Sequence, residues 1–402
     1  MTRISVQEAL PFEPMSRLML CRLFLVLQFI VQPVFAQTSG EPIFSQQTRT
    51  QMLGAITTYQ AVLDRGGWRA VPVGPLLEPG DRDIRIRAVR ARLLAVDELT
   101  DKESLASERY DDSLGQDVQR FQRRHGLLPD GRIGPATVRA MSVPAAHRLA
   151  QLRLNYERLE RLAESVTASR YVLVNIPALE LSAVQDGQVE LTSAVVIGKA
   201  DRQTPELSSR ITAVNFHPTW HVPFSISQRD LFPLLKTNPG YLRREGYQFF
   251  RGTDNQEIPQ EQVLAQKLTP HQVWLQKPPG PTNPLGRIRL SMPNSLAIFL
   301  HDSPASWLFS RPARALSSGC VRVARIVELS HWLLADKQDW SLDQIGEVLR
   351  ASRPLTAVLQ TPVPVHLVYV TAWVNQSGAV QFRDDVYARL SGAVRASGNG
   401  SN

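Results

Sequence analysis

The chain has 402 residues, which corresponds to two or three domains of about 150 residues each. It carries 45 Lys and Arg against 37 Asp and Glu, for a formal charge of +8, and 43% of its residues are hydrophobic. This ordinary globular composition excludes an intrinsically disordered, collagen-like or multi-span membrane protein. Two cysteines occur, Cys21 and Cys320, which excludes a disulfide-rich scaffold and a multi-cysteine zinc or iron–sulfur site.

Residues 1–36 have the pattern of a secretory signal peptide. Basic Arg17 and Arg22 precede an apolar stretch at residues 23–31, and the segment ends in Val-Phe-Ala, with small residues where a signal peptidase needs them. The apolar stretch is too short for a stable membrane span. We therefore expect cleavage at the end of this segment, export to the periplasm and no membrane span in the mature chain. An uncleaved anchor is the alternative, and Met15 is an alternative start.

Signal cleavage removes Cys21 and leaves Cys320 without a partner in the mature chain. An oxidising compartment normally pairs its cysteines. A lone thiol in an exported protein is therefore either buried and inert or kept for its reactivity.

The first part of the mature chain is predicted to be helical. Apolar residues at helical spacing predict a helix over residues 48–65, within a short helical scaffold region at residues 37–82. Residues 83–145 favour three short helices, the last of which begins with Pro135. A leucine-rich helix in residues 146–169 is expected to link this unit to the remainder.

Strand-like patterns dominate the second part, residues 170–390, where β-branched and apolar residues alternate between turn residues. A segment rich in Pro, Gln and aromatic residues, about 218–284, interrupts the strands, and an insertion of this length is typical of a functional cap. Residues 391–402 are expected to form a flexible tail. The expected fold is α+β and multidomain: helical N-terminal units, then a β-rich, β-sandwich-like domain with an inserted capping subdomain.

One motif falls in the predicted three-helix unit. It reads Phe121-Gln122-x-x-His125-Gly126-Leu127-x-x-Asp130-Gly131-x-Ile133-Gly134-Pro135-x-Thr137. It resembles the three-helix peptidoglycan-binding domain, which implies that residues 83–145 bind peptidoglycan. A plain helical spacer is the alternative.

A second set of motifs lies in the β-rich region. The set comprises Gly198-Lys199-x-Asp201-Arg202-x-Thr204-Pro205, Trp220-x-Val222-Pro223, Pro279-Gly280-Pro281-x-Asn283-x-Leu285-Gly286-Arg287, His301-Asp302-Ser303 and Ser317-Ser318-Gly319-Cys320-Val321-Arg322-Val323. Together the motifs resemble the long-form, periplasmic branch of the L,D-transpeptidase family, whose catalytic domain is of the YkuD type. One departure is Ser318, where the family has His.

The resemblance implies an activity and its partners. It implies a cysteine acyltransferase that forms 3→3 peptidoglycan cross-links through a thioester on Cys320, with roles in peptidoglycan and cell wall biogenesis and in cell shape. The donor would be a tetrapeptide stem and the acceptor the diaminopimelate amine of a second stem. Acylation by carbapenems is also implied.

The residue types in the last motif predict the same chemistry by themselves. A thiol is a nucleophile only as its thiolate and needs a base, and a loop can bring His301 to Cys320 so that the imidazole takes the thiol proton and returns it to the leaving amine. Gly319 lets the backbone approach closely, so that amides at 319–320 stabilise an oxyanion. Arg322 is suited to bind a carboxylate of an anionic peptide. The resemblance further implies that a backbone carbonyl next to His301 orients its ring.

The remaining site candidates are one further residue of the catalytic loop and four for the substrate. They are Ser318 for the catalytic loop and Asn283, Arg287, Trp220 and Phe299, beside Arg322, for substrate binding. For the two aromatic residues, core packing is the alternative.

No cofactor, metal or nucleic acid is expected. His217-x-x-x-His221 has metal-ligand spacing, but Pro218 and the following Val222-Pro223 make the stretch extended, and no third ligand accompanies it. No basic stripe with interleaved aromatic residues is present.

Two other functions stay open at this point. One is an L,D-carboxypeptidase, or an enzyme that anchors proteins to the wall, using the same acyl-enzyme. The other is a non-catalytic peptidoglycan-binding protein.

Overall fold

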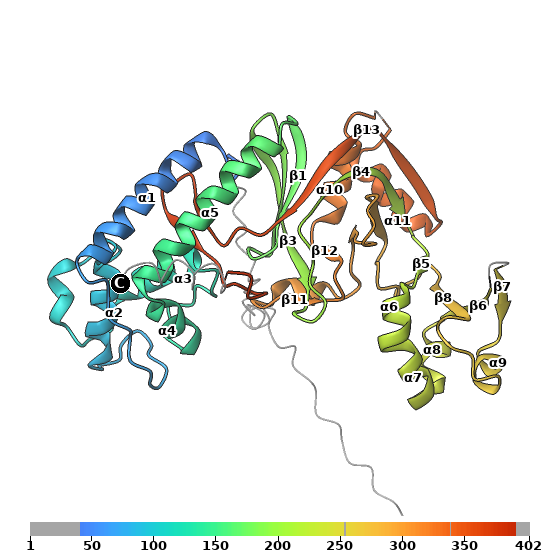
Figure 1. Ribbon diagram of the computed structural model, residues 1–402, viewed down its shortest axis with the longest axis horizontal. Coiled ribbons are helices and arrows are strands. Elements are labelled where there is room, and N and C mark those ends of the chain that lie inside the picture. The colour runs from blue at the N-terminus through green and yellow to red at the C-terminus, as the bar shows by residue number, and fades with distance from the viewer. Residues whose placement is uncertain (1–40, 253–254, 338, 391–402) are drawn as a thin grey trace, which may run out of the picture. The chain divides into compact units, whose positions relative to one another are not determined.

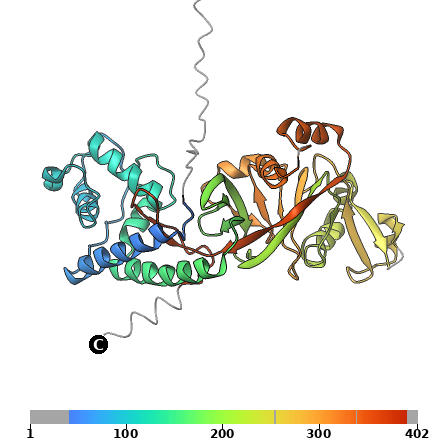
Figure 2. The same cartoon turned by 90° about the horizontal axis from the view of Figure 1, so that it is seen from above.

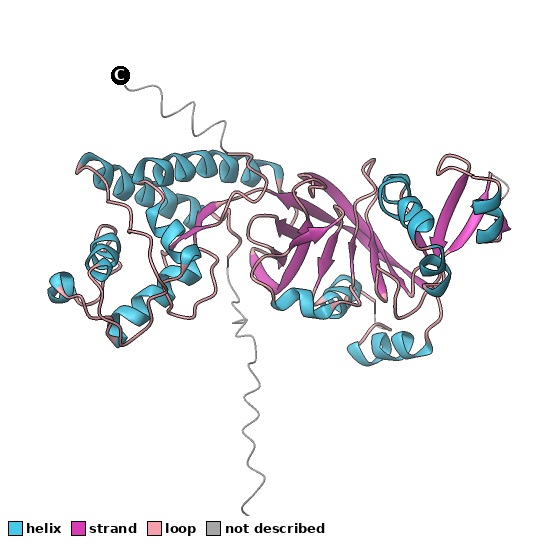
Figure 3. Cartoon of the chain, turned by 90° about the horizontal axis from the view of Figure 1, so that it is seen from below, coloured by secondary structure: helices cyan, strands magenta, loops and turns pink. Residues whose placement is uncertain are grey.

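The computed structural model describes residues 41–252, 255–337 and 339–390 (Figure 1). The predicted signal peptide, residues 1–36, and the predicted tail, residues 391–402, lie outside the described residues. Helices occupy the first part of the described chain and strands most of the second (Figure 3). No helix in the described part is long and apolar enough to cross a membrane.

Five α-helices and a 3₁₀ turn make up the N-terminal part. They are α1 (Gln46–Asp64), α2 (Arg85–Leu94), η1 (Lys102–Ala106), α3 (Asp112–Arg124), α4 (Pro135–Ser142) and α5 (Ala145–Ser165). Side-chain caps set two of the starts, since Ser45 accepts from the Thr48 amide and Asp111 from the Leu114 amide. Pro135 is the first residue of α4, as predicted.

Two separate cores hold these helices. One core joins α2, α3 and α4 through fully buried residues such as Ile86, Leu114 and Met141. The other contains Met52 of α1 and Leu152 of α5, together with residues of the β-rich part. Helix α1 therefore shares its core with α5, a grouping that helical periodicity does not reveal.

Nine strands form the main sheet of the β-rich part. They are β1 (Arg170–Asn175), β2 (Glu180–Gln185), β3 (Gln188–Gly198), β4 (Leu207–Phe216), β9 (Ile288–Ser291), β10 (Leu300–His301), β11 (Ala315–Ser317), β12 (Val321–Val323) and β13 (Leu355–Val368). Their order is β11-β3-β12-β10-β9-β4-β13-β1-β2, and β3 also pairs with β2, so the sheet closes on itself. The 14-residue β13 runs as a long ribbon through it (Figure 2). This confirms the expected β-rich class, with one sheet curled over its own core.

The core inside this sheet is aliphatic and is covered by two helices. Fully buried Val195, Leu290 and Val321 belong to it, and helices α10 (Ile326–Leu334) and α11 (Leu342–Ala351) pack against it. A 3₁₀ turn, η3 (Ser306–Ser310), lies between β10 and β11. The closed core gives the short strands β9, β10 and β12 a rigid base.

The capping insertion has its own sheet and core. It comprises β5 (Trp220–His221), α6 (Phe224–Ile226), η2 (Ser227–Leu231), α7 (Phe232–Thr237), α8 (Pro239–Arg244), β6 (Gln248–Arg251), β7 (Gln256–Ile258), α9 (Gln260–Ala265) and β8 (Val273–Lys277). The strands pair in the order β5-β8-β6-β7. Leu242, Phe249 and Leu275 are among the buried residues of a core that does not include the main sheet.

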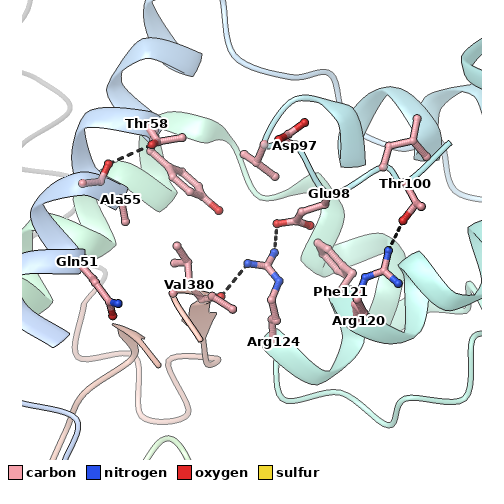
Figure 4. A pocket seen from close by; sticks show the side chains of 16 residues that line it. Gln51, Ala55, Thr58, Asp97, Glu98, Thr100, Arg120, Phe121, Arg124 and Val380 are labelled. Carbon is pink, nitrogen blue, oxygen red and sulfur yellow. Dashed lines mark hydrogen bonds and ion pairs between the residues drawn. The ribbon is translucent and has the colours of Figure 1, made fainter. Parts of the chain in front are cut away.

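The last strands return to the helices. Strands β14 (Ala372–Val374) and β15 (Val380–Phe382) form a hairpin. Arg124 of α3 forms an ion pair with Glu98 and donates a 2.8 Å hydrogen bond to the carbonyl of Val380, at the wall of a cavity of about 640 Å³ (Figure 4). The C-terminal hairpin thus contacts the three-helix unit directly.

Candidate active site

The main sheet places one imidazole between two guanidinium groups. Strand β10 lies between β9 and β12, and the strand register pairs His301 with Arg289 on one side and with Arg322 on the other. Cross-strand partners project to the same face of a sheet. The side chains of Arg289, His301 and Arg322 therefore form a row across three strands.

Cys320 follows a tight turn that its neighbours hold in place. The hydroxyl of Ser317 donates to the Cys320 carbonyl at 2.6 Å and accepts from the Gly319 amide at 3.1 Å. The hydroxyl of Thr204 donates to the Gly319 carbonyl at 2.7 Å. Gly319 has a φ of 119°, which side chains with a Cβ rarely tolerate. Glycine is therefore needed immediately before the thiol.

The turn leaves one backbone donor beside the thiol. The sequence suggested amides at both 319 and 320, but the Gly319 amide is already bound to Ser317. Within the described ranges, the Cys320 amide makes no hydrogen bond. The Cys320 amide is therefore the donor that a developing oxyanion at this turn would find.

The ring of His301 is held in one tautomer. Its Nδ1 lies 2.6 Å from the carbonyl oxygen of Asp302, and because a carbonyl can only accept, Nδ1 carries the proton. A backbone carbonyl next to His301 is what the family resemblance implied. The Asp302 carboxylate accepts instead from the amides of Arg287 and Ser303. The Nε2 atom of His301 is left as the basic nitrogen.

Burial keeps His301 neutral. The side chain is 4% exposed, and burial, with a further contribution from the Arg322 charge, lowers the pKa of His301 to about 4. At neutral pH the imidazole is therefore a free base.

The Cys320 side chain is partly exposed and protonated in this state. Its Sγ donates to the carbonyl of Ala297 at 3.7 Å. Burial raises the pKa of the Cys320 thiol, while the Phe299 amide and the charges of Arg322 and Arg289 lower it. The described residues show no hydrogen bond between the thiol and His301, so a proton transfer requires the thiol to turn away from Ala297.

Both groups line one cavity of about 530 Å³. Its walls come from the cap, from the 284–299 region and from the strands around His301: Trp220, His221, Val222, Pro223, Ser225, Ile226, Pro284, Leu285, Arg289, Leu296, Ala297, Ile298, Phe299, His301, Ser317, Ser318, Cys320 and Arg322. Six residues singled out from the sequence are in this set. They are Trp220, Phe299, His301, Ser318, Cys320 and Arg322.

Three other candidates do not line the cavity. Gly319 is buried behind the turn. Asn283 is fully buried; its amide nitrogen donates to the carbonyls of Pro218 and Pro278, and its oxygen accepts from the Leu285 amide. Arg287 is exposed and outside the lining set. Asn283 therefore fastens the base of the cap, with its polar atoms already used, and substrate binding by Asn283 and Arg287 stays a prediction.

Sequence reasoning missed Arg289, although it lines the cavity. Its guanidinium lies over the ring of Phe299, 4.9 Å from the centroid. The only signal in the sequence is its place within the strand-like stretch Arg287-Ile288-Arg289-Leu290. Pairing it with His301 requires the strand register, which the sequence alone does not provide.

A salt bridge ties the cap to the catalytic turn. Arg202, in the loop between β3 and β4, pairs with both carboxylate oxygens of Asp230 in the cap at 2.5 and 2.7 Å. The same guanidinium donates to the hydroxyl of Ser318 at 3.2 Å. The residue that replaces the family His thus connects the cap to the turn before Cys320.

The two histidines with metal-ligand spacing point to different neighbours. Buried His217 lies 3.2 Å from the carbonyl of Val348, whereas exposed His221 lines the cavity. Among the described residues, no group of three or more His, Cys, Asp or Glu is placed to hold a metal ion.

Two family models match the chain. Residues 169–365 match the YkuD family, described as the L,D-transpeptidase catalytic domain, and residues 83–141 match the family described as "Putative peptidoglycan binding domain". The chain therefore carries an L,D-transpeptidase catalytic domain of the YkuD family behind a peptidoglycan-binding domain.

Two curated proteins are similar over part of their length. A Haemophilus influenzae protein named "Putative L,D-transpeptidase" is 32% identical over 237 residues, which cover 58% of this chain and 47% of that protein. The Mycobacterium tuberculosis N-acetylmuramoyl-L-alanine amidase CwlM is 36% identical over 91 residues, 21% of this chain and 22% of its own. The chain thus spans about half the length of the first relative and about a fifth of the second.

Solved structures of L,D-transpeptidases also match, at low similarity. The enzyme from Stackebrandtia nassauensis is 13% identical with a TM-score of 0.28, and the match covers 73% of this chain and 94% of that one. The enzyme from Xylanimonas cellulosilytica is 15% identical with a TM-score of 0.24, covering 74% and 99%. Likeness at this level supports no further conclusion.

Proposed function

We propose that the protein is an L,D-transpeptidase that forms 3→3 peptidoglycan cross-links through a thioester on Cys320. One observation carries the proposal: a neutral His301, whose Nδ1 proton is held by the Asp302 carbonyl, lines the same cavity as the Cys320 thiol. This is a base–nucleophile pair in its uncharged form, from which the imidazole can activate the thiol for acyl transfer.

Acylation begins when the thiol turns from Ala297 toward the imidazole. Nε2 of His301 takes the thiol proton, and Sγ attacks the carbonyl carbon that follows the L-centre of diaminopimelate in a donor tetrapeptide. The Cys320 amide donates to the oxyanion. The carbon–nitrogen bond then breaks, His301 returns its proton to the leaving amine, and the terminal D-Ala departs.

Transfer completes the cycle. The diaminopimelate amine of a second stem attacks the thioester, gives a proton to His301, and Cys320 leaves as a thiolate that is reprotonated. The cap contributes Trp220 and Ile226 to the cavity wall, where they help to exclude water that would convert transfer into hydrolysis.

The proposal places the protein in the periplasm after removal of residues 1–36. There the three-helix domain would hold the catalytic domain on peptidoglycan. Without residues 1–36 the net charge is +7, which favours approach to anionic wall polymers.

Acylation by a carbapenem tests the proposal directly. The purified protein incubated with imipenem should gain the mass of one drug molecule, and Cys320→Ala should gain none. Because the described chain contains no other cysteine, peptide mapping should find the adduct at residue 320. No adduct, or an adduct that survives Cys320→Ala, would contradict the proposal and favour a non-catalytic wall-binding protein.

The acceptor is decided by a second measurement. Wild-type protein given disaccharide tetrapeptides should yield cross-linked dimers linked 3→3, visible by mass spectrometry. Tripeptides without dimers would instead assign an L,D-carboxypeptidase, and a protein–peptide adduct would assign wall anchoring.

A further inference from the structure

Two arginines that line the cavity beside His301 and Cys320 form no ion pair and no side-chain hydrogen bond. The side-chain Nε atoms of Arg289 and Arg322 are both buried and form no hydrogen bond. Within residues 41–252, 255–337 and 339–390, neither guanidinium pairs with a carboxylate, and no Asp or Glu affects the pKa of either. Their positive charges are therefore uncompensated by the protein.

Some other buried arginines of this chain find acceptors for part of the guanidinium group. Arg124 pairs with Glu98, and the buried Arg148 donates to Gln151 and to the carbonyl of Ala140. Taking a guanidinium out of water without an acceptor is costly. Arg92 is also short of acceptors, since both of its terminal nitrogens are buried without a hydrogen bond. Unlike Arg92, Arg289 and Arg322 line a cavity, where a ligand could supply the missing acceptors.

No acidic side chain faces these arginines in the cavity. The residues lining it include no Asp or Glu. His301 is neutral at physiological pH, so the two guanidinium groups supply the fixed charge of the cavity. A cavity with two unpaired cations and no acidic group selects an anionic ligand.

Spacing indicates how the anionic groups of that ligand are arranged. Arg289 and Arg322 stand one strand to either side of His301, so their Cα atoms are roughly 10 Å apart at two strand spacings. The reacting carbonyl must lie near His301, between them. A matching peptide carries one carboxylate on each side of the bond that is cut.

We infer that Arg289 and Arg322 form a two-point receptor for a peptide with a carboxylate on both sides of the scissile amide. Arg289 is then a specificity-determining residue. The inference rests on the proposed function for the identity of the scissile amide. One carboxylate belongs to the leaving residue and the other to a side chain of the residue that is acylated. An added residue at the C-terminus would move the terminal carboxylate by about 3.5 Å and out of register.

The binding of three donor peptides to variants of the protein tests whether Arg289 and Arg322 each bind one carboxylate. The donors are a tetrapeptide as the free acid, its C-terminal amide, and its side-chain amide. Binding is measured by calorimetry in the Cys320→Ala background, which needs no turnover. Each amidation should weaken binding to Cys320→Ala by about 10-fold or more, the usual loss when a charge-assisted hydrogen bond is removed.

Substituting Arg289 should abolish the preference for one of the two carboxylates over its amide. In the Cys320→Ala background, Arg289→Gln should bind the free-acid peptide as weakly as Cys320→Ala alone binds one of the two amidated peptides. Arg289→Gln should also bind that amidated peptide and the free acid equally. Arg322→Gln should lose the other preference. Arg289→Lys should restore part of the discrimination, because it restores the charge without the planar fork.

Arg210→Gln is the matched control. Arg210 is an exposed arginine on β4 outside the cavity, so its loss changes the net charge equally and should leave all three affinities unchanged. Thermal unfolding of each variant establishes that it is folded.

The outcomes separate this inference from the proposed function. The inference would be wrong if all three peptides bind equally or if none binds. It would also be wrong if Arg289→Gln and Arg322→Gln both discriminate between the peptides as before. Each of these results would hold even if imipenem acylates Cys320. Discrimination that depends on Arg289 would uphold it, even if no cross-linked product is formed.

Discussion

At the residue scale, the protonation of His301 contributes to how the protein responds to pH. The pKa of His301 is about 4, below the ordinary value of 6.5, because the ring is buried and Arg322 is near. A histidine that is neutral in the fold contributes stability fully above pH 6.5, and that contribution is lost as pH falls from 6.5 toward 4, since the unfolded chain binds the proton more readily.

The same shift predicts the acid limb of the reaction. The kcat/KM for acylation by imipenem should stay level from pH 7 to pH 5 and fall only near pH 4. In Arg322→Gln the limb should move to higher pH, because one cation that opposes protonation is gone. Stopped-flow acylation rates across this range measure both. A limb near 6.5 in the wild type would mean that His301 is not the base or is not buried during acylation.

Gly319 illustrates how strictly one position can be set. A side chain there would have to adopt a φ of 119° in a turn held by Ser317 and Thr204. Gly319→Ala should therefore slow acylation by at least 10-fold, from strain of about 1–3 kcal/mol, with little change in the rate at which free thiol reagents modify the unfolded protein. Wild-type acylation in Gly319→Ala would show that the turn is free to relax.

At the element scale, the cap is tied to the catalytic turn through Asp230, Arg202 and Ser318. The pKa of the Asp230 carboxyl lies below its usual range because Arg202 donates to it, so the tie is intact at neutral pH. Thr204, in the same loop as Arg202, holds the Gly319 carbonyl. We therefore expect movement of the cap to reach the turn that precedes Cys320.

Removing the charge of Asp230 should loosen the cap. We expect Asp230→Asn to raise hydrogen–deuterium exchange in residues 224–237 several-fold, consistent with the loss of about 1 kcal/mol from a partly exposed ion pair. The ratio of hydrolysed to transferred product should rise with it. Glu261→Gln is the control, since it breaks an exposed pair with Arg243 inside the cap. Equal hydrogen–deuterium exchange of residues 224–237 in the two variants would show that the Asp230–Arg202 salt bridge does not hold the cap.

At the scale of the whole molecule, one core connects distant parts of the chain. Leu152 of α5, Met52 of α1, Leu173 of β1 and Phe382 of β15 belong to the same buried cluster. The N-terminal helices and the main sheet are therefore expected to unfold together rather than one after the other.

Leu152→Ala tests this coupling. Leu152 is fully buried, and removing its side chain should cost about 2–5 kcal/mol. Calorimetry should show a single transition at lower temperature, and the imipenem reactivity of Cys320 should be lost in that same transition. Leu53→Ala, at a half-exposed position on α1, should change little. Loss of the helical signal at a temperature where Cys320 still reacts would show that the two parts are independent.

Local features were predictable because they depend on neighbours in the chain. The start of α4 at Pro135 follows from the ring of proline itself, and the cap was evident from the long interruption between strands. Cys320 and His301 stood out because their motifs are short and ordered. Asn283 stood out for the same reason, yet its amide closes a loop and is buried. A motif marks a residue as special without saying whether it serves the fold or the ligand.

The sequence by itself determined the class of the fold and the peptidoglycan-binding and L,D-transpeptidase domains, and it predicted that Cys320 and His301 act together, since each of these depends on residue type and order. Only the tertiary structure decided that Arg289 stands opposite His301, that the Gly319 amide is already used, and that Ser318 is linked to the cap. The physical reason is that strand register and the closure of the sheet are set by packing between residues far apart in the chain, and no local pattern encodes those distances.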